Sequence, residues 1–181
     1  MGTKATVAIA AIWILLSGAF TSVRAQQPQI PTLQVCNQTQ VKGKALVKIA
    51  SRSDATHAGA FTVFIELKCD PSGTGYPVGT LEIKELSMSD STVQGTITAV
   101  TFEQVTSTGK HSPTAYLNGR CKAPQVSGCR FWLVIADNKQ ANQAGTADVI
   151  GFLVFNGTGQ RVAYGTGPVV EGDVAVAPTG N

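Results

Sequence analysis

The sequence predicts an all-β protein, a single antiparallel β-sandwich of about eight or nine strands that is reinforced by disulfides. Short runs rich in β-branched and aromatic residues follow one another after residue 40, and Gly, Pro, Asn, Ser and Asp separate them. No segment repeats its apolar residues at helical spacing over a useful length. Four cysteines behind an export signal are typical of domains whose thiols are oxidised.

The first 25 residues are expected to be a secretory signal peptide. Lys4 supplies the positive charge, residues 7–16 form an apolar stretch, and small residues surround a cleavage site after Ala25. The apolar stretch is shorter than the roughly 20 residues that span a bilayer, so cleavage is favoured over an uncleaved anchor. The mature chain is therefore expected to start at Gln26, to have no membrane span, and to be extracellular or periplasmic.

Removal of 25 of the 181 residues leaves 156, a length that fits one domain. Residues 26–40 contain two prolines among several glutamines and are expected to form an extended N-terminal arm, and residues 41–178 the β-sandwich domain. Cleavage removes two basic residues and no acidic one, so the formal charge falls from +3 to +1. Because the remaining lysines are interleaved with apolar residues, the mature chain is not predicted to bind nucleic acid.

Nine strands are expected, and in chain order they span residues 41–50, 60–68, 80–87, 93–105, 114–121, 129–136, 148–155, 160–164 and 169–176. In the second run, every other residue from Phe61 to Leu67 is apolar, which predicts a core-facing side. The third run alternates less regularly, and Leu81 and Ile83 share its expected inner face.

The sixth and seventh runs add two further predictions. Residues 131–136 are apolar on both faces, which is typical of a central strand covered on both sides, and Trp132 is therefore expected in the core. Residues 156–159, Asn-Gly-Thr-Gly, tolerate positive φ angles and predict a hairpin loop between the flanking strands.

Four cysteines can pair in three ways, and the sequence alone does not choose between them. Cys121 and Cys129 flank what looks like a connection between adjacent strands, so a local disulfide is the simplest pairing. A second disulfide between Cys36 and Cys69 then follows by elimination. A zinc site is disfavoured because the paired CxxC spacing of such sites is missing.

Nothing in the sequence predicts an enzyme or a cofactor. His57 and His111 are the two histidines, both in loop-like segments, and neither belongs to an HExxH motif. The chain also lacks a Gly-x-Ser-x-Gly elbow. A secreted hydrolase with a triad assembled from distant positions stays open as a rival hypothesis, because such triads are recognised by geometry.

The segment from residue 137 to residue 148 is a candidate calcium site. Asp137, Asn138 and Asp148 offer hard oxygen ligands at one end of the expected fold, although the spacing does not fit an EF-hand loop. The favoured alternative is that these side chains make turn hydrogen bonds.

Carbohydrate binding through an exposed aromatic ring is another candidate. Tyr76 follows a Gly-Thr-Gly segment and is the ring most expected to be exposed. The favoured function is a non-catalytic binding or structural module at the cell exterior, whose partner is an extracellular or cell-envelope protein or a glycan. A calcium-dependent carbohydrate-binding or adhesion module is the alternative.

The later part of the chain resembles the post-COAP domain of secreted bacterial proteins. The resemblance consists of an ordered series of strand and turn motifs: Phe61-Thr62-Val63-Phe64, Gly79-Thr80-Leu81-Glu82-Ile83, Thr96-Ile97-Thr98-Ala99-Val100, Ala115-Tyr116-Leu117-Asn118-Gly119, Phe131-Trp132-Leu133-Val134, Asp148-Val149-Ile150-Gly151-Phe152 and Gly159-Gln160-Arg161-Val162-Ala163-Tyr164. The resemblance implies a β-rich accessory module without an agreed catalytic role. The four cysteines depart from that pattern.

Two sequons, at Asn37 and Asn156, would accept N-glycans in a eukaryotic secretory pathway and have no such role in a bacterial one.

Overall fold

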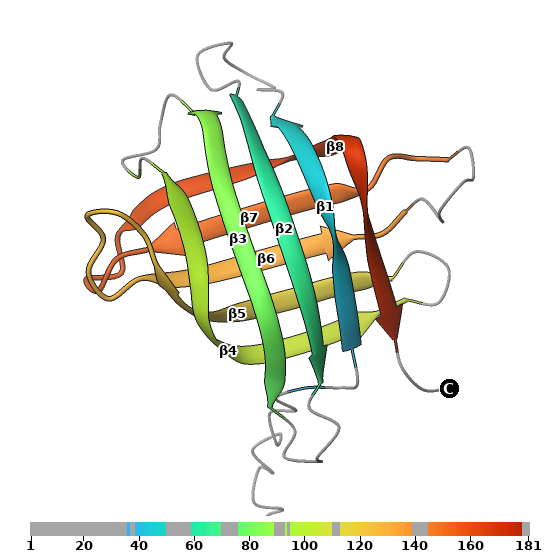
Figure 1. Ribbon diagram of the computed structural model, residues 1–181, viewed down its shortest axis with the longest axis horizontal. Coiled ribbons are helices and arrows are strands. Elements are labelled where there is room, and N and C mark those ends of the chain that lie inside the picture. The colour runs from blue at the N-terminus through green and yellow to red at the C-terminus, as the bar shows by residue number, and fades with distance from the viewer. Residues whose placement is uncertain are drawn as a thin grey trace, which may run out of the picture. The chain divides into compact units, whose positions relative to one another are not determined.

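Eight antiparallel strands close into a barrel in the computed structural model, which describes residues 36, 39–49, 59–69, 76–88, 93, 95–109, 113–138 and 145–178 (Figure 1). The strands are β1 (Thr39–Ile49), β2 (Gly59–Cys69), β3 (Pro77–Met88), β4 (Thr96–Thr108), β5 (Thr114–Lys122), β6 (Arg130–Ala136), β7 (Val149–Phe155) and β8 (Arg161–Pro178). No helix occurs in these ranges, so the expectation of an all-β antiparallel fold is confirmed.

The predicted β-sandwich is wrong, because the first and last strands pair with each other. Residues 39–47 of β1 lie antiparallel to the second half of β8, and this pairing closes the sheet into a barrel. Inward and outward residues alternate along each strand in a sandwich and in a barrel alike. The hydrophobic pattern therefore predicts the strands and their inner faces but does not distinguish the two architectures.

One long strand makes the closure possible. The two runs predicted at residues 160–164 and 169–176 form the single strand β8, whose first half pairs with β7 and whose second half pairs with β1. The pairing with β1 shifts register at Val170, and Gly172, with a φ angle of 84°, lies two residues further along β8. A residue with a side chain rarely adopts this conformation, so glycine permits the irregularity.

Strand β4 has a similar role on the other side of the barrel. Its first three residues pair with β3, and the rest pair with β5 through two register shifts that follow Ala99 and Phe102. Bulges of this kind bend a strand and increase its twist. In Figure 1, β1–β3 run across β5–β7, and β4 and β8 belong to both groups.

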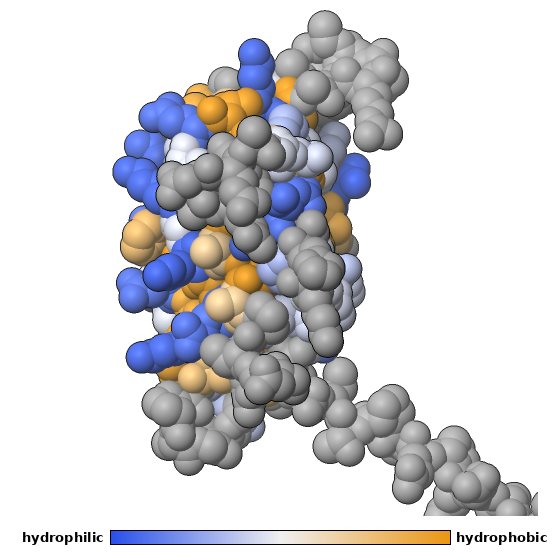
Figure 2. All heavy atoms as spheres, turned by 90° about the vertical axis from the view of Figure 1, so that its right-hand side faces the viewer, coloured by the Kyte–Doolittle hydropathy of each residue, from blue (hydrophilic) through white to orange (hydrophobic). Residues whose placement is uncertain are grey.

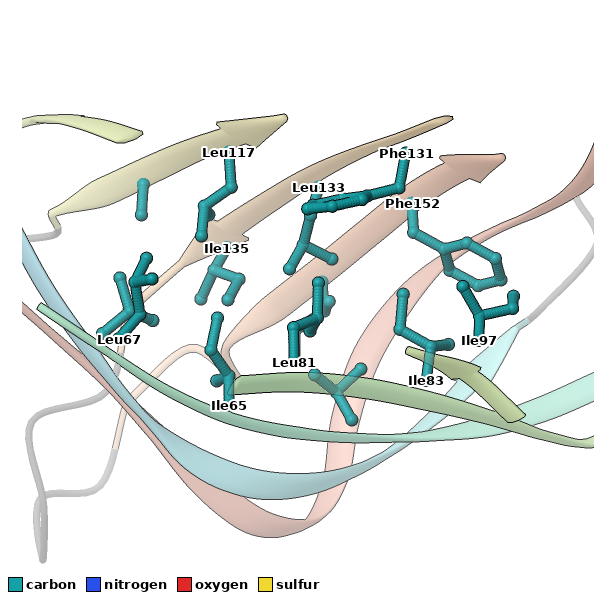
Figure 3. Packing of buried hydrophobic residues seen from close by; sticks show 14 of the residues in the cluster. Ile65, Leu67, Leu81, Ile83, Ile97, Leu117, Phe131, Leu133, Ile135 and Phe152 are labelled. Atoms are coloured by element: carbon teal, nitrogen blue, oxygen red, sulfur yellow. The ribbon is translucent and has the colours of Figure 1, made fainter. Parts of the chain in front are cut away.

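The interior of the barrel is a packed hydrophobic core (Figure 3). The expected inner faces are confirmed, since the alternate residues from Phe61 to Leu67 and both Leu81 and Ile83 are buried. The ring centroids of Phe61 and Phe152 lie 4.8 Å apart in an edge-to-face arrangement. Because protein side chains occupy the interior, the candidate ligand contacts lie on the outer surface.

Both expected disulfides are present. Cys36 is bonded to Cys69 at the end of β2, and Cys121 of β5 is bonded to Cys129 just before β6. The backbone N–H of Cys121 also donates to the carbonyl of Cys129 at 3.0 Å. Two disulfides are consistent with an oxidising, extracellular environment.

Several predicted features lie outside the described residues. These are the signal peptide at residues 1–25, the N-terminal arm up to residue 38 apart from Cys36, both histidines and the sequon at Asn37. In the part of the chain that is described, no helix is long and apolar enough to cross a membrane.

Candidate functional site

The outer surface of β5–β8 carries a group of aromatic and aliphatic side chains, which we call the aromatic face. Tyr116, Trp132 and Val134 of this group are exposed, and Leu153 and Tyr164 are half-buried. Trp132 is 60% exposed and Tyr116 is 47% exposed, which is far above the values of the core residues on the same strands. Contiguous exposed apolar side chains, unlike single ones, mark surfaces where partners or ligands bind.

Strand register places these side chains in adjacent rows across the barrel wall. Trp132 lies opposite Asn118 on β5 and opposite Leu153 on β7, and Leu153 lies opposite Tyr164 on β8. Tyr116 is diagonal to Trp132, at a separation that large side chains can bridge. A row that crosses four strands measures about 14 Å, so the aromatic face is long enough for an extended ligand.

The prediction that Trp132 lies in the core is wrong. Phe131, Leu133 and Ile135 fill the interior from β6, so Trp132 and Val134 point outward between them. In a barrel each strand has one face toward the core and one toward the outside, whereas a central strand of a layered fold can be covered on both. The second apolar side of β6 is therefore a surface feature.

A row of three arginines adjoins the aromatic face, and we call it the arginine row. Arg120 of β5 lies directly opposite Arg130 of β6, Arg130 lies opposite Phe155 of β7, and Phe155 lies opposite Arg161 of β8. Like charges directly opposite one another on neighbouring strands destabilise a sheet. A counter-charge offsets this repulsion, and Glu103 supplies it.

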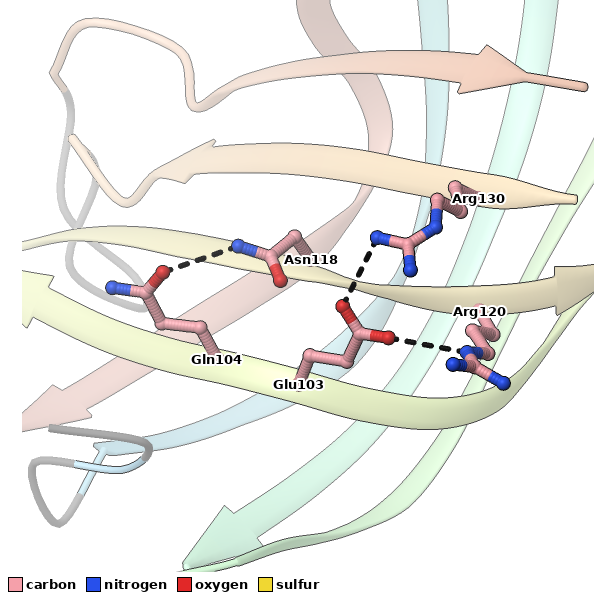
Figure 4. Close-up of polar contacts among 5 residues, drawn as sticks. All are labelled: Glu103, Gln104, Asn118, Arg120 and Arg130. Atoms are coloured by element: carbon pink, nitrogen blue, oxygen red, sulfur yellow. Dashed lines mark hydrogen bonds and ion pairs between the residues drawn. The ribbon is translucent and has the colours of Figure 1, made fainter. Parts of the chain in front are cut away.

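Glu103 of β4 reaches across two strands to the arginine row (Figure 4). One carboxylate oxygen accepts from Arg120 Nε at 3.3 Å and the other accepts from Arg130 Nη1 at 3.4 Å. The Arg120 and Arg130 side chains are nevertheless 66% and 54% exposed. Exposed ion pairs of this length contribute little to stability. Because both side chains are more than half exposed, their guanidinium groups are accessible to a ligand.

Two further contacts connect the polar and aromatic parts of this surface. The guanidinium of Arg161 lies 4.1 Å from the ring centroid of Tyr164, a cation–π geometry. Beside Trp132, Asn118 Nδ2 donates to Gln104 Oε1 at 3.2 Å. The rings are thus bordered by guanidinium and amide groups that can form hydrogen bonds with a ligand.

The outer surface of β1–β3 has a different character. Opposite charges face each other there, with Lys42 opposite Glu66 and Lys44 opposite Asp173. Pairs of this kind are typical of a solvated sheet surface.

A hollow of about 290 Å³ lies beside these pairs, above the short side chains of Ala175 and Ala177, and none of its lining residues is aromatic. Figure 2 shows the side of the barrel that carries the second half of β8, where hydrophobic atoms lie between hydrophilic ones. We regard this hollow as the space between long charged side chains rather than as the leading site.

Tyr76, the ring singled out from the sequence, is 62% exposed, as expected. It lies just before β3, away from the strands that carry the aromatic face. Sequence analysis therefore selected a single loop tyrosine and missed the larger group of rings. The missed signal was the outward register of β5 and β6, which places Tyr116, Trp132 and Val134 on the side opposite the core residues.

The three candidate calcium ligands form structural hydrogen bonds. Asp137 Oδ2 accepts from the backbone N–H of Val176 at 2.9 Å, and Asp148 Oδ1 accepts from the backbone N–H of Asn138 at 2.9 Å. Asn138 Nδ2 donates to the carbonyl of Ala147. Across the described ranges, no group of three or more acidic, histidine or cysteine side chains is arranged to hold a metal ion.

Burial and neighbouring groups also determine the pKa of Asp137 at this end of the barrel. Burial raises the pKa of Asp137 above its ordinary value of 3.8, and the hydrogen bond from Val176 lowers the pKa in part. The nearby carboxylates of Asp148 and Asp173 raise the pKa further.

The predicted hairpin at residues 156–159 is confirmed. Asn156 Oδ1 accepts from the backbone N–H groups of Thr158 and Gln160 at 3.1 and 2.9 Å, so this sequon residue holds the turn between β7 and β8.

Comparisons with known proteins give no relative. No protein-family model, curated protein or solved structure matches this chain.

Proposed function

We propose that this protein is a non-catalytic binding module of the cell exterior, and that its ligand is a glycan lying on the aromatic face. The observation that carries the proposal is the exposure of Trp132 and Tyr116 on neighbouring strands of a closed barrel. Exposed rings on a sheet are held in place by the backbone pairing on both sides, so they form a preorganised surface.

The chemistry around the rings favours a sugar over a purely apolar partner. Sugar rings present apolar C–H faces, which stack on aromatic rings, and a rim of hydroxyl groups. Asn118 and Gln104 lie beside Trp132 and offer both donors and acceptors to such hydroxyls. An apolar protein surface would bury these amides without offering them hydrogen bonds, so it would gain nothing from their presence.

A binding role without catalysis is supported by the types of polar group on this surface. They are chiefly amides and guanidinium groups, which neither attack substrates nor exchange protons near neutral pH. The two disulfides fit an extracellular site of action.

Intrinsic fluorescence tests the proposal directly. Trp132 is the only tryptophan in residues 26–181, so its emission reports on this surface alone. Neutral and acidic polysaccharides should be screened for a blue shift or quenching of that emission, and positive cases measured by isothermal titration calorimetry. We expect Trp132→Ala and Tyr116→Ala each to weaken binding by about tenfold or more, as loss of a central aromatic contact does.

Phe64→Ala is the matched control. Phe64 is an exposed aromatic residue on the outer surface of β2, 43% accessible, and at least two strands separate β2 from β5 and β6, which carry Tyr116 and Trp132. It should leave binding unchanged. Equal losses in the control and in Trp132→Ala, or a complete polysaccharide panel that leaves the emission unaltered, would contradict the proposed function.

A further inference from the structure

We infer that the glycan is acidic, and that the arginine row of Arg120, Arg130 and Arg161 binds carboxylate groups of its uronic acid units. This inference rests on the proposed function, since it concerns the ligand of the same surface. The arginine row is adjacent to the Trp132 row, because on β5 and β6 it lies two residues away along each strand. One polymer can therefore stack on the rings and present its carboxylates to the arginines.

The structure contains an internal carboxylate that illustrates the fit. Glu103 gives one oxygen to Arg120 and the other to Arg130, so a single carboxylate bridges the two guanidinium groups. Each guanidinium has five N–H donors, and Glu103 receives one from each in these contacts. Donors thus remain on two highly exposed side chains, and planar guanidinium groups match carboxylates through paired hydrogen bonds.

The balance of charge on this side of the barrel also favours an anion. Lys122 follows Arg120 on the outer side of β5, so four basic side chains here accompany Glu103. On the surface of β1–β3, Lys42 and Lys44 lie opposite acidic residues, whereas Lys48, Lys68 and Lys84 do not. An excess of positive charge beside stacking rings is complementary to a polymer that carries both sugar rings and regular negative charges.

Arg161 extends the row to the fourth strand. Its guanidinium lies over the Tyr164 ring, which holds a charged group next to the end of the aromatic face. The row from Arg120 to Arg161 crosses the same strands as the row from Asn118 to Tyr164, so charge and ring surface run parallel.

A single-stranded nucleic acid also combines stacking rings with regular anions. We favour the glycan because the contacts of Glu103 show that carboxylate oxygens fit the guanidinium groups of Arg120 and Arg130, and because the disulfides fit an extracellular environment. The nucleic acid is therefore included as an outcome of the test.

The test compares each acidic polymer with its own neutral form. Polygalacturonate, alginate and hyaluronate are each titrated against their methyl esters, with the oxidised full-length mature protein and Trp132 emission as the readout. We expect at least one acid form to bind about tenfold or more tightly than its ester, and this preference to shrink as salt rises. Arg120→Gln combined with Arg130→Gln should remove the preference, so that the variant binds the acid form no more tightly than the ester.

Lys84→Gln combined with Lys44→Gln is the control, because it removes the same charge from the surface of β1–β3. An equal loss in this control would assign the effect to net charge alone and overturn the inference. Equal binding of acid and ester by the wild-type protein would overturn the acidic assignment and leave the proposed function standing. Failure of every polysaccharide to bind would overturn both. Tighter binding of an oligothymidylate, or of dextran sulfate, than of any uronate would also overturn the carboxylate assignment.

Discussion

The two disulfides close loops of very different length, and chain entropy predicts that they stabilise the barrel unequally. The bond between Cys36 and Cys69 spans a sequence separation of 33, whereas the bond between Cys121 and Cys129 spans 8. A crosslink restricts the unfolded chain more when the loop it closes is longer. The long-range bond should therefore contribute more to the free energy of unfolding.

The loop-closure relation gives the size of the difference. The long loop corresponds to about 3.7 kcal/mol and the short loop to about 2.5 kcal/mol at room temperature. For a domain of this size, each kcal/mol corresponds to a shift of about 3 °C in Tm. The bonds should therefore differ by about 1.2 kcal/mol, or about 4 °C, in favour of the one between Cys36 and Cys69.

Variants that retain a single disulfide isolate each crosslink. One carries Cys121→Ala and Cys129→Ala, and the other carries Cys36→Ala and Cys69→Ala. Guanidinium chloride unfolding of each variant, measured oxidised and then reduced, compares identical sequences and so cancels the packing cost of the alanines. A larger difference between the oxidised and reduced forms for the bond between Cys121 and Cys129 would refute the entropic argument.

Three further predictions concern the fold and the acidic end of the barrel. Gly119→Ala should destabilise the protein by about 2 kcal/mol in chemical unfolding, because the added carbon would overlap the β4 backbone. Gly145→Ala should have almost no effect, because its added carbon would lie 3.9 Å from the Asn138 carbonyl oxygen, an ordinary van der Waals distance. The pKa of Asp137 is raised in the folded state, so the folded protein binds this proton more tightly than the unfolded chain does. The contribution of Asp137 to stability is therefore greatest below about pH 3.8 and is lost as the pH rises through the raised pKa. Asp137→Asn, which keeps an oxygen for the Val176 N–H, should therefore gain stability relative to wild type as the pH increases, and a constant difference across the pH range would contradict this. Calcium should leave Tm unchanged in differential scanning fluorimetry, because Asp137 and Asp148 already accept backbone hydrogen bonds; a rise that Asp148→Ala abolishes would restore the calcium hypothesis.

Local sequence chemistry was sufficient to predict most of the strands. Alternation predicted the buried sides of β2 and β3, and the Asn-Gly-Thr-Gly segment predicted the hairpin before β8. Barrel closure was not predictable in this way, because the pairing of β1 with β8 joins residues more than 100 positions apart in the sequence. Nothing in the composition of either strand specifies its partner, and β8 was divided in two because its glycines interrupt the strand pattern.

The error in the fold and the error at Trp132 have one physical origin. A strand that is apolar on both sides, such as β6, indicates a layered fold only if another element covers its second side. Once β1 and β8 are paired, Phe131, Leu133 and Ile135 on the inner side of β6 help to fill the closed core, and Trp132 lies on the opposite side of the strand. The described strands supply no second layer over Trp132, so its exposure is a consequence of closure. A large apolar ring placed outward on every copy of such a barrel would favour nonspecific association unless a ligand used it. Polar groups border Trp132: Asn118 lies opposite it on β5, and the arginine row lies two residues away along the strands. These groups limit nonspecific association and suit a ligand with hydroxyl groups and negative charge.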